Sequence, residues 1–313
     1  MLDFDFSATG KTVAFLFIMN SEQFLNNLFF ILFTHDSPIS LCFAFIFGAL
    51  IGSFLNVCAY RIPAGRSIVS PASSCFSCGE IIKWYFNIPI LGYILLRGKC
   101  HDCGNKFSCR YAVVEFIIAC LSCLLFYRLG GFTISFFYYF FFFCFLTIVF
   151  LIDLDRWLIL DSILLPSGVF GFLFSPFVSQ KIDCKDLFYL FSLPIYNIPD
   201  WGYIFIDSIL GGILGFIIFY GISFYGLLVF KQDAMGGGDI KFALCIGLFL
   251  GIEKSIYAFV LSFIIGVIFL LPFMMIKKKS GREPVPFGTF MAIASMASLL
   301  FFDLIRKFIF GFY

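Results

Sequence analysis

Long apolar stretches separated by short polar segments make up most of this chain. A helix that crosses a bilayer needs about 20 mostly apolar residues, with some latitude for tilt. Eight stretches approach or exceed that length, and they predict an all-α, polytopic membrane protein with about eight transmembrane helices: residues 38–60, 111–127, 133–152, 157–178, 203–230, 240–252, 255–276 and 286–305. The sixth is the shortest. Its Lys241 must lie at one end, because a charged side chain is costly at membrane depth.

The first 37 residues have a different pattern. The run between residues 12 and 33 is apolar, but polar side chains interrupt it, namely Asn20, Glu22, Asn26 and Asn27. This pattern favours a helix that lies in the membrane interface, with a full span as the alternative. The predicted organisation is an N-terminal interfacial segment (1–37), a first transmembrane helix (38–60), a polar insertion (61–110) and a transmembrane core (111–313).

The composition agrees with a bilayer as the solvent. Hydrophobic residues make up 61% of the chain and charged residues only 13%, whereas a soluble domain has about 25% charged residues. A water-soluble fold of 313 residues could not hide that much apolar surface. The 50 phenylalanines suit a lipid-facing surface. The net charge of +2 is too small to indicate a nucleic-acid partner.

The placement of charge predicts the orientation of the chain. Residues 61–110 carry seven basic side chains against two acidic ones, and a second basic cluster at residues 277–282 separates the last two spans. Short loops rich in Lys and Arg stay in the cytoplasm. An even number of spans lies between the two clusters, so both fall on the cytoplasmic side. Only Arg306 and Lys307, which this count places outside, oppose that orientation.

Four cysteines in the insertion have the spacing of a zinc site. Cys75 and Cys78 form one C-x2-C knuckle, and Cys100 and Cys103 form another. Four thiolates in this arrangement can close a tetrahedral zinc site. A metal would supply much of the folding energy of so small a polar unit. The alternatives are two disulfides, which a reducing cytoplasm disfavours, or four idle thiols. His101 and Cys109 lie near enough in sequence to serve as substitute ligands.

Two aspartates stand out among the acidic residues near the spans. Asp153 ends an apolar span, and Asp239 follows the glycines Gly236 and Gly238 at the start of a short helix. Acids at membrane depth are costly and are functional candidates by default. Because two spans separate Asp153 from Asp239, both belong at the cytoplasmic face. Other acids in or beside the spans are Glu115, Asp155, Asp161, Asp207 and Asp303.

A pair of neighbouring carboxyl groups predicts hydrolysis by the chemistry of aspartic proteases. Two such groups tend to share one proton, so one can activate a water while the other polarises a carbonyl. Gly236 and Gly238 allow an extended backbone that could admit a substrate strand. A single Asp is more simply explained by contact with the interface, but the matched pair favours function. We expect the remaining span acids to be structural: Asp155, Asp161 and Asp207 at helix ends or polar contacts, and Glu115 as a buried structural or substrate-facing acid.

These motifs, in this order, resemble those of the bacterial type IV prepilin leader peptidase/N-methyltransferase family of intramembrane aspartic peptidases. The ordered set is specific, whereas a lone G-x-G-D would not be. The resemblance covers about residues 40–305 and rests on Gly48-Ala-Leu-Ile-Gly-Ser-Phe-Leu-Asn-Val57, Tyr60-Arg-Ile-Pro63, the two cysteine knuckles, Asn87-Ile-Pro89, Leu96-Arg-Gly98, Arg110-Tyr111, Val114-Glu115, Asp153-Leu-Asp-Arg-Trp-Leu-Ile-Leu-Asp161, Gly236-Gly-Gly-Asp239 and Pro286-Phe-Gly288.

The resemblance implies a function and its site. It implies eight spans in the inner membrane of a bacterium, Asp153 and Asp239 as the catalytic pair, and zinc on the four knuckle cysteines. The implied substrates are type IV prepilins and the pseudopilins of type II secretion. Their leader is cut at the cytoplasmic face after a glycine, and the new N-terminus, usually Phe, is methylated from S-adenosylmethionine. No glycine-rich nucleotide-binding loop is present, so methyl transfer rests on the resemblance alone.

The chain also departs from the family pattern at several places. Leu160 stands where the family often has Pro, and Thr289 stands where Pro often follows Pro-Phe-Gly. The N-terminal segment is longer than usual, and residues 180–200 look like an insertion. None of these differences touches the aspartates or the cysteine knuckles.

Two other functions remain open. A membrane transporter with an acidic ion path and a zinc loop for docking would suit acids scattered over several spans. A peptidase without methyltransferase activity, like archaeal preflagellin peptidases, is disfavoured because those relatives lack the cysteine-bearing insertion.

Overall fold

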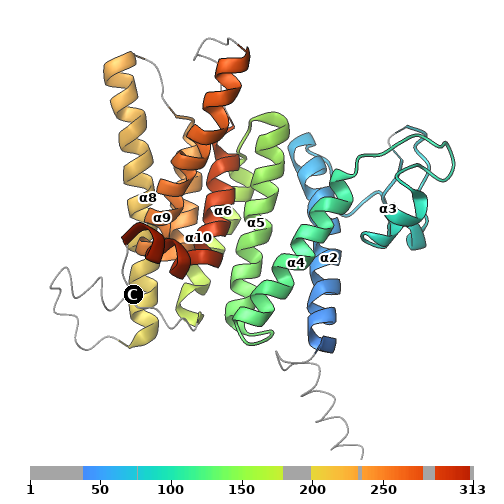
Figure 1. Ribbon diagram of the computed structural model, residues 1–313, viewed down its shortest axis with the longest axis horizontal. Coiled ribbons are helices and arrows are strands. Elements are labelled where there is room, and N and C mark those ends of the chain that lie inside the picture. Colours follow the sequence, from blue (N-terminus) through green and yellow to red (C-terminus); the bar gives the residue numbers. More distant parts are fainter. Residues whose placement is uncertain (1–37, 76, 179–198, 232–234, 278–285, 311–313) are drawn as a thin grey trace, which may run out of the picture.

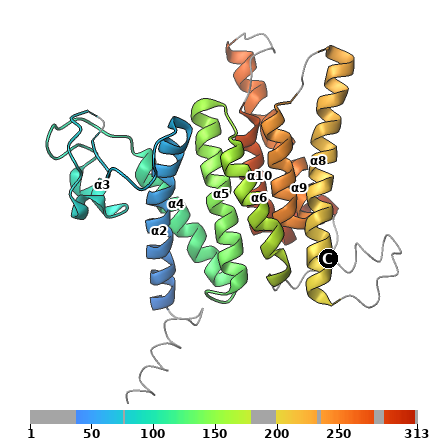
Figure 2. The ribbon, with the colours of Figure 1, turned by 180° about the vertical axis from the view of Figure 1, so that it is seen from behind.

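The computed structural model describes residues 38–75, 77–178, 199–231, 235–277 and 286–310 (Figures 1 and 2). The predicted interfacial segment and nearly all of the predicted insertion at residues 180–200 lie outside these ranges. The described residues form helices and no strand, with two isolated bridges in the polar insertion. The predicted all-α fold is therefore confirmed for them. The long helices are α2 (Pro38–Arg61), α4 (Arg110–Arg128), α5 (Ile134–Arg156), α6 (Asp161–Phe174), α8 (Asp200–Phe230), α9 (Gly237–Lys277) and α10 (Phe287–Phe310).

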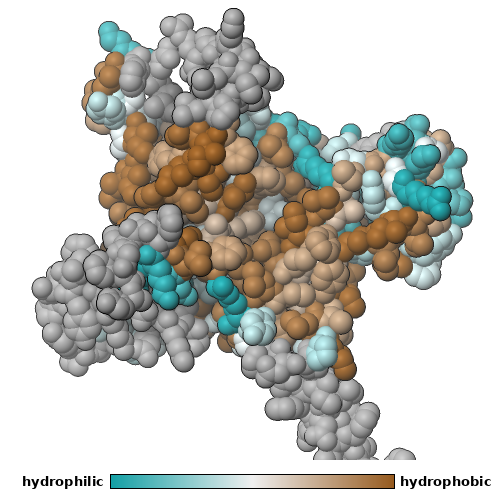
Figure 3. Space-filling model, viewed as in Figure 1, coloured by the Kyte–Doolittle hydropathy of each residue, from teal (hydrophilic) through white to brown (hydrophobic). Residues whose placement is uncertain are grey.

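Six of these helices are long and apolar enough to cross a membrane, and α6 with the following turn η3 (Ser175–Phe177) forms a shorter apolar helix. The chain is thus a multi-pass membrane protein. An apolar surface covers the helices in Figure 3, while hydrophilic residues gather on the polar insertion. That insertion contains only short elements, namely η1 (Ile62–Ala64), η2 (Trp84–Asn87) and α3 (Leu91–Leu96), and it lies beside α2 and α4 in both ribbon views.

Helix α9 contains two of the predicted spans. Gly251 has φ 73° and ψ −173°, so the helix is broken there. A β-carbon placed on Gly215 of α8 would lie 2.5 Å from the carbonyl oxygen of Ala243 and 3.0 Å from the ring of Phe259. Those two residues would be about 24 Å apart along a straight helix. The chain therefore folds back at Gly251, and the predicted separation of residues 240–252 from residues 255–276 is correct.

The fold-back is held by an acid from α8. Asp207 is 5% exposed, and its Oδ1 accepts a hydrogen bond of 3.0 Å from the backbone N–H of Ile252. This N–H begins the second segment of α9 and has no helical partner, because the first N–H groups of a helix are unsatisfied. Asp207 thus satisfies a helix end, as the sequence predicts.

The predicted span at residues 157–178 is too long at its first end. Trp157 adopts a left-handed conformation with φ 56°, which ends α5, and α6 starts only at Asp161. The four residues between them form a linker that crosses the end of the bundle. A hydropathy pattern cannot detect this linker, because Trp157, Leu158, Ile159 and Leu160 are themselves apolar.

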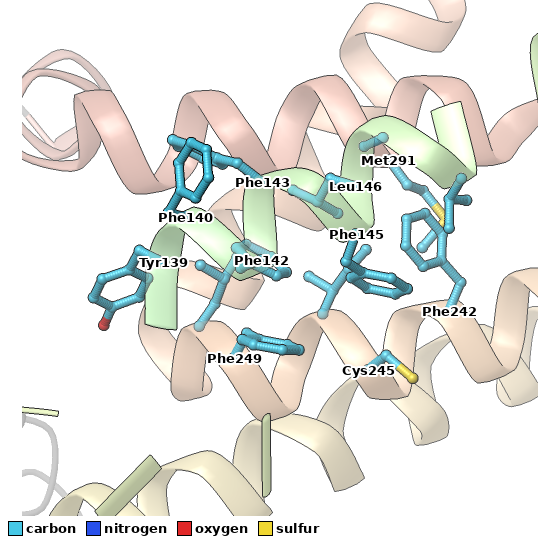
Figure 4. Packing of buried hydrophobic residues seen from close by; sticks show 14 of the residues in the cluster. Tyr139, Phe140, Phe142, Phe143, Phe145, Leu146, Phe242, Cys245, Phe249 and Met291 are labelled. Carbon is cyan, nitrogen blue, oxygen red and sulfur yellow. The ribbon is translucent and has the colours of Figure 1, made fainter. Parts of the chain in front are cut away.

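Aromatic packing places α5 at the centre of the bundle. Of its most apolar stretch, 67% is buried inside the molecule, against 22% for α8. Figure 4 shows Phe142 and Phe145 of α5 packed against Phe249 of α9, with Met291 of α10 nearby. Lipid chains are as apolar as these side chains, so close packing and ring contacts stabilise the assembly more than the hydrophobic effect does. Many phenylalanines therefore face the interior, where the composition suggested lipid.

Small residues let α2 and α4 approach closely. A β-carbon on Gly48 would lie 2.6 Å from the β-carbon of Ser122, and one on Gly52 would lie 2.8 Å from the α-carbon of Glu115. Such glycine contacts are typical of helix pairs in membranes. They fix the α2–α4 pair, from whose ends the polar insertion projects.

Gly251→Ala should destabilise the protein by about 1–3 kcal/mol, because its backbone conformation is essentially restricted to glycine. The added methyl would also meet the carboxylate of Asp207. Thermal unfolding in detergent measures the effect. Gly221→Ala is the matched control, since Gly221 of α8 has open space around it. Equal unfolding temperatures for the two variants would contradict the fold-back at Gly251.

Candidate functional site

Asp153 lies at the buried end of α5. It is 3% exposed, and its Oδ2 accepts a hydrogen bond of 2.8 Å from the backbone N–H of Thr289. Thr289 is in the first turn of α10, where backbone N–H groups lack helical partners and the helix dipole attracts negative charge. The carboxyl group of Asp153 thus reaches from the end of one helix to the start of another.

Asp239 lies in the first turn of α9 and is partly buried. The glycines before it bring the chain close to its own carboxyl group, since a β-carbon on Gly236 would lie 3.1 Å from Asp239 Oδ2. The carboxyl group of Asp239 interacts electrostatically with that of Asp153. The structure therefore brings together the two aspartates that the sequence singles out, although 86 positions separate them in the chain.

Ile159, in the linker between α5 and α6, connects the surroundings of the two aspartates. A β-carbon on Gly238 would lie 3.0 Å from the β-carbon of Ile159, and one on Gly288 would lie 2.8 Å from its Cδ1. The same atom on Gly288 would also lie 2.9 Å from Asp153 Oδ2. Glycine is needed at both positions because any side chain would separate α9 and α10 from the end of α5.

Two short helical segments lie beside this pair. Helix α6 has 14 residues, and the first segment of α9 runs from Gly237 to Gly251. Each is about 21–22 Å long, while the hydrocarbon core is about 30 Å thick. In Figure 1 the ends of α8 and of the second α9 segment project well beyond this end of α5. The end of α5 that carries Asp153 therefore stops short of the ends of α8 and of the second segment of α9.

The other span acids have structural partners. Asp155 forms a bidentate ion pair with Arg110, with N–O distances of 2.6 and 2.8 Å, and Asp161 pairs with Lys241 at 2.7 and 2.9 Å. These contacts join the start of α4 to the end of α5 and the start of α6 to the start of α9. The predicted roles of Asp155 and Asp161 in polar contacts are confirmed. Lys241 lies at the start of its helix, as predicted.

Glu115 anchors the polar insertion to the membrane helices. This residue of α4 is 9% exposed and accepts a hydrogen bond of 2.6 Å from the backbone N–H of Ile90. Ile90 precedes α3 and has φ 63°, a strained conformation for a β-branched residue. A buried carboxylate holding a strained loop residue is a specific contact, and it agrees with the predicted structural role of Glu115.

The four knuckle cysteines meet in the polar insertion. Their sulfur atoms all lie within 4.8 Å of one another, and Cys75 Sγ is 3.8 Å from Cys103 Sγ. A tetrahedral zinc site with Zn–S bonds of about 2.3 Å requires sulfur atoms about 3.8 Å apart. A disulfide requires about 2.05 Å, and all four cysteines are free. The cluster therefore fits a metal ion and does not fit the disulfide alternative.

The two knuckles have the same local geometry. The N–H of Gly79 donates to the carbonyl of Cys75 at 2.9 Å, and the N–H of Gly104 donates to the carbonyl of Cys100 at 3.0 Å. Both glycines have positive φ, 77° and 70°. Backbone N–H groups of Cys78 and Ser77 stabilise the sulfur of Cys75 and lower the pKa of its thiol to about 6. A thiolate, the form that binds metal, is thus available at neutral pH.

Neither substitute ligand belongs to the cluster. His101 packs its ring against Phe86, with centroids 5.1 Å apart, and contacts Asp102 through Nδ1 at 3.1 Å. Cys109 is exposed and lies outside the group of sulfur atoms. The four knuckle sulfurs are the complete candidate ligand set among the described residues.

A cavity of about 710 Å³ separates the polar insertion from the ends of α2 and α4. Asn56, Tyr111 and Glu115 line it from the membrane helices, while Phe86 and Phe107 line it from the insertion. Motif spacing cannot reveal this cavity, since its walls come from segments with no common pattern. The sequence also gave no sign of the contact between the Thr289 N–H and Asp153, because a backbone donor carries no side-chain signature.

The chain matches two family models. Residues 46–129 match the bacterial peptidase A24 N-terminal domain, and residues 140–271 match the type IV leader peptidase family. The first region contains α4 and the cysteine cluster, and the second contains Asp153 and Asp239.

Curated relatives cover most of the chain. A prepilin leader peptidase/N-methyltransferase of Bacillus subtilis is 30% identical over 270 residues, which are 86% of this chain and 97% of the relative. Proteins of the same name from Vibrio cholerae and Myxococcus xanthus are 34% and 30% identical, over 71% and 76% of this chain and 82% and 67% of the relatives. No solved structure matches the chain.

We predict that the purified protein contains about one zinc ion per chain and that Cys75→Ser loses it, because three thiolates leave the tetrahedral site open. Metal analysis of the purified variants measures the zinc content. Cys109→Ser is the matched control, as it removes an exposed thiol of the same insertion from outside the cluster. Full zinc content in Cys75→Ser, or none in the unaltered protein, would contradict the assignment.

Proposed function

The chain belongs to the type IV leader peptidase family, and on that premise we propose that it cleaves the leader peptides of type IV prepilins and type II secretion pseudopilins and then N-methylates the new N-terminal residue. The observation that carries the proposal is the meeting of Asp153 and Asp239 around Ile159, at one end of the bundle. Zinc, S-adenosylmethionine and the cytoplasmic orientation enter as further parts of the same proposal.

Cleavage would use the two aspartates as an acid and a base. One carboxylate takes a proton from a water molecule as the water oxygen attacks the scissile carbonyl carbon, and the other carboxyl group donates its proton to the carbonyl oxygen. When the tetrahedral species collapses, the C–N bond breaks and the leaving nitrogen takes the proton that the first carboxyl group had removed from water. The other carboxylate recovers its proton from the hydroxyl group formed on the carbonyl oxygen. The products are a leader carboxylate and a free amine on the mature pilin. The reaction needs no covalent intermediate.

Backbone groups support this chemistry. The N–H of Thr289 fixes one oxygen of the Asp153 carboxyl group, so that this carboxyl group is oriented before substrate binds, which limits reorganisation during the reaction. The extended backbone expected beside Asp239 is not found, because α9 begins at Gly237 and the N–H of Asp239 donates to the carbonyl of Gly236 at 3.0 Å. Gly236 and Gly238 carry no side chains, and we assign them the role of leaving room for the substrate backbone next to the pair. Polar backbone at this depth is tolerated where it lines a cavity.

Zinc would be structural in this protein. Cys75, Cys78, Cys100 and Cys103 would hold it, and the bound ion would fold the polar insertion, which has only short helices and two isolated bridges of its own. The insertion carries the basic excess of the chain, which supports its placement in the cytoplasm. Cleavage would then occur at the cytoplasmic face of the inner membrane, where the Arg110–Asp155 ion pair joins the end of the insertion to α5.

Methyl transfer is the second activity. When bound, S-adenosylmethionine supplies an electrophilic methyl group, which passes to the uncharged terminal amine as the carbon–sulfur bond breaks and its electron pair stays on sulfur. The chain itself must hold the new N-terminus, keep its amine unprotonated and exclude water from the donor. These requirements place the donor site at the same membrane face as the aspartate pair.

The contacts of the acids other than Asp153 and Asp239 argue against the transporter alternative. Asp155 and Asp161 are engaged in ion pairs, and Asp207 accepts a hydrogen bond from the backbone N–H of Ile252. Acids with such fixed partners do not form an ion path. Only Asp153 and Asp239 are left together, as hydrolysis requires.

Asp153→Asn and Asp239→Asn should each reduce leader cleavage by at least about a thousandfold, since an amide can neither activate the water nor share the proton. Cleavage of a synthetic prepilin by detergent-solubilised enzyme is followed by mass spectrometry, which reads loss of the leader and gain of a methyl group separately. Asp303→Asn, which changes an exposed acid of α10, is the control. Retained cleavage in either dyad variant would refute the peptidase proposal.

Thr289→Pro should slow cleavage about tenfold without abolishing it, because proline has no N–H to donate to Asp153. The family often has proline at this position, so the fold should accept it. Thr289→Ser keeps the N–H and should cleave at the normal rate. The comparison of kcat for the two variants isolates the hydrogen bond, and equal values would show that this contact does not assist the reaction.

A further inference from the structure

The cavity between the polar insertion and the membrane helices is built from two different kinds of wall. Its floor comes from α2 and α4, whose buried polar groups are held in place: Asn56 Nδ2 donates to the carbonyl of Tyr111 at 3.1 Å, and Glu115 accepts from Ile90. Its cover comes from the insertion and includes the aromatic rings of Phe86, Tyr93 and Phe107. The Glu115–Ile90 bond joins the floor to the cover, so the walls are fixed relative to each other.

The size and lining of this space suit a small polar ligand. Its volume of about 710 Å³ lies within the range of about 300–1,000 Å³ that is typical of ligand sites. Basic, acidic and aromatic side chains all line it, among them Arg66, Lys83 and Glu115. A ligand that complements the basic, the acidic and the aromatic side chains carries an anionic group, a cationic group and a flat ring system.

We propose that this cavity binds S-adenosylmethionine, an inference that rests on the methyltransferase part of the proposed function. The donor has a carboxylate for a basic side chain, an ammonium and a sulfonium for a carboxylate or a ring face, and an adenine for aromatic stacking. Glu115 and the ring of Phe86 are the cavity residues that meet the cationic and aromatic requirements. The site needs no glycine-rich loop, which accounts for the lack of such a loop in the sequence.

The cavity is also at the required end of the molecule. Arg110, beside the cavity residue Tyr111, is paired with Asp155, two positions after Asp153. Arg156 Nη1 donates to the carbonyl of Pro63 at 3.4 Å, which ties the end of α5 to the start of the insertion. The cavity and the aspartate pair therefore share one face of the bundle. An amine released by cleavage reaches the cavity without crossing the membrane.

Direct binding tests the proposal without relying on catalysis. S-adenosylmethionine is titrated calorimetrically into the full-length, zinc-loaded protein in detergent, and ultraviolet cross-linking with labelled S-adenosylmethionine is followed by peptide mapping. Phe86→Ala should weaken binding about tenfold through lost stacking, and Glu115→Gln should weaken it by about as much through lost charge. The label should map within residues 53–115. Zinc content and unfolding temperature report whether each variant is folded.

Trp84→Ala is the matched control for Phe86→Ala. Both residues lie in the turn η2, but Trp84 is 79% exposed and does not line the cavity. This variant should bind S-adenosylmethionine as the unaltered protein does. If Trp84→Ala and Phe86→Ala lost affinity for S-adenosylmethionine equally, the loss would be an effect on folding. The affinity of Glu115→Gln and the position of the cross-linked label would then decide. Normal affinity in Glu115→Gln, or a label outside the cavity, overturns the site.

The outcomes separate this inference from the proposed function. If the unaltered protein binds and transfers the methyl group while Phe86→Ala and Glu115→Gln bind normally, the cavity assignment alone is overturned. If the unaltered protein cleaves prepilin but neither binds S-adenosylmethionine nor adds a methyl group, the methyltransferase proposal fails and this inference fails with it. A raised KM for prepilin cleavage in both variants, with unchanged S-adenosylmethionine affinity, would assign the cavity to the peptide substrate instead.

Discussion

The structure depends on placing two carboxyl groups together at a depth where water is scarce. Burying an ionisable group costs free energy unless polar partners compensate for the lost water. Here the end of α5, the linker at Ile159 and the starts of α9 and α10 converge, so that backbone N–H groups at a helix start face Asp153. The short first segment of α9 and the short α6 leave this meeting point below the ends of their neighbours. The ion pair between Lys241 and Asp161 joins the starts of these two segments.

The polar insertion obeys a different constraint. It is too small and too poor in regular structure to fold on a hydrophobic core of its own, so the four-sulfur cluster, where we propose a metal, and the anchor at Glu115 together define its position. Glycines at 48 and 52 bring α2 against α4, which sets the floor on which the insertion rests. The cavity arises between a metal-held cover and a helix-held floor, and neither part encloses it alone. This arrangement separates the aspartate pair, the proposed hydrolytic site, from the cavity proposed as a ligand site, while the Arg110–Asp155 ion pair keeps both at one face.

Much of this could be read from one sequence, because the bilayer restricts the possible structures. Apolar stretches located every long helix in the described part of the chain. Counting the stretches placed Asp153 and Asp239 at the same end, and C-x2-C spacing identified the sulfur cluster. The break in α9 was predicted from two adjacent apolar runs, and Gly251 explains it. Two details could not be read in this way. The apolar linker from Trp157 to Leu160 looks like helix, since hydropathy does not record backbone conformation. The phenylalanines of α5 look like lipid-facing residues, since lipid and protein interior favour the same side chains.

The sequence by itself determined the class of structure, the number and order of the helices, the two aspartates and the four cysteines, because these follow from composition along the chain and from the spacing of chemically distinctive residues. Only the tertiary structure decided which partner each structural acid has, which backbone N–H meets Asp153, and that a cavity separates the insertion from α2 and α4. Those properties depend on contacts between segments far apart in the chain. A backbone donor such as that of Thr289 has no residue type of its own, and a cavity exists only as the space between walls.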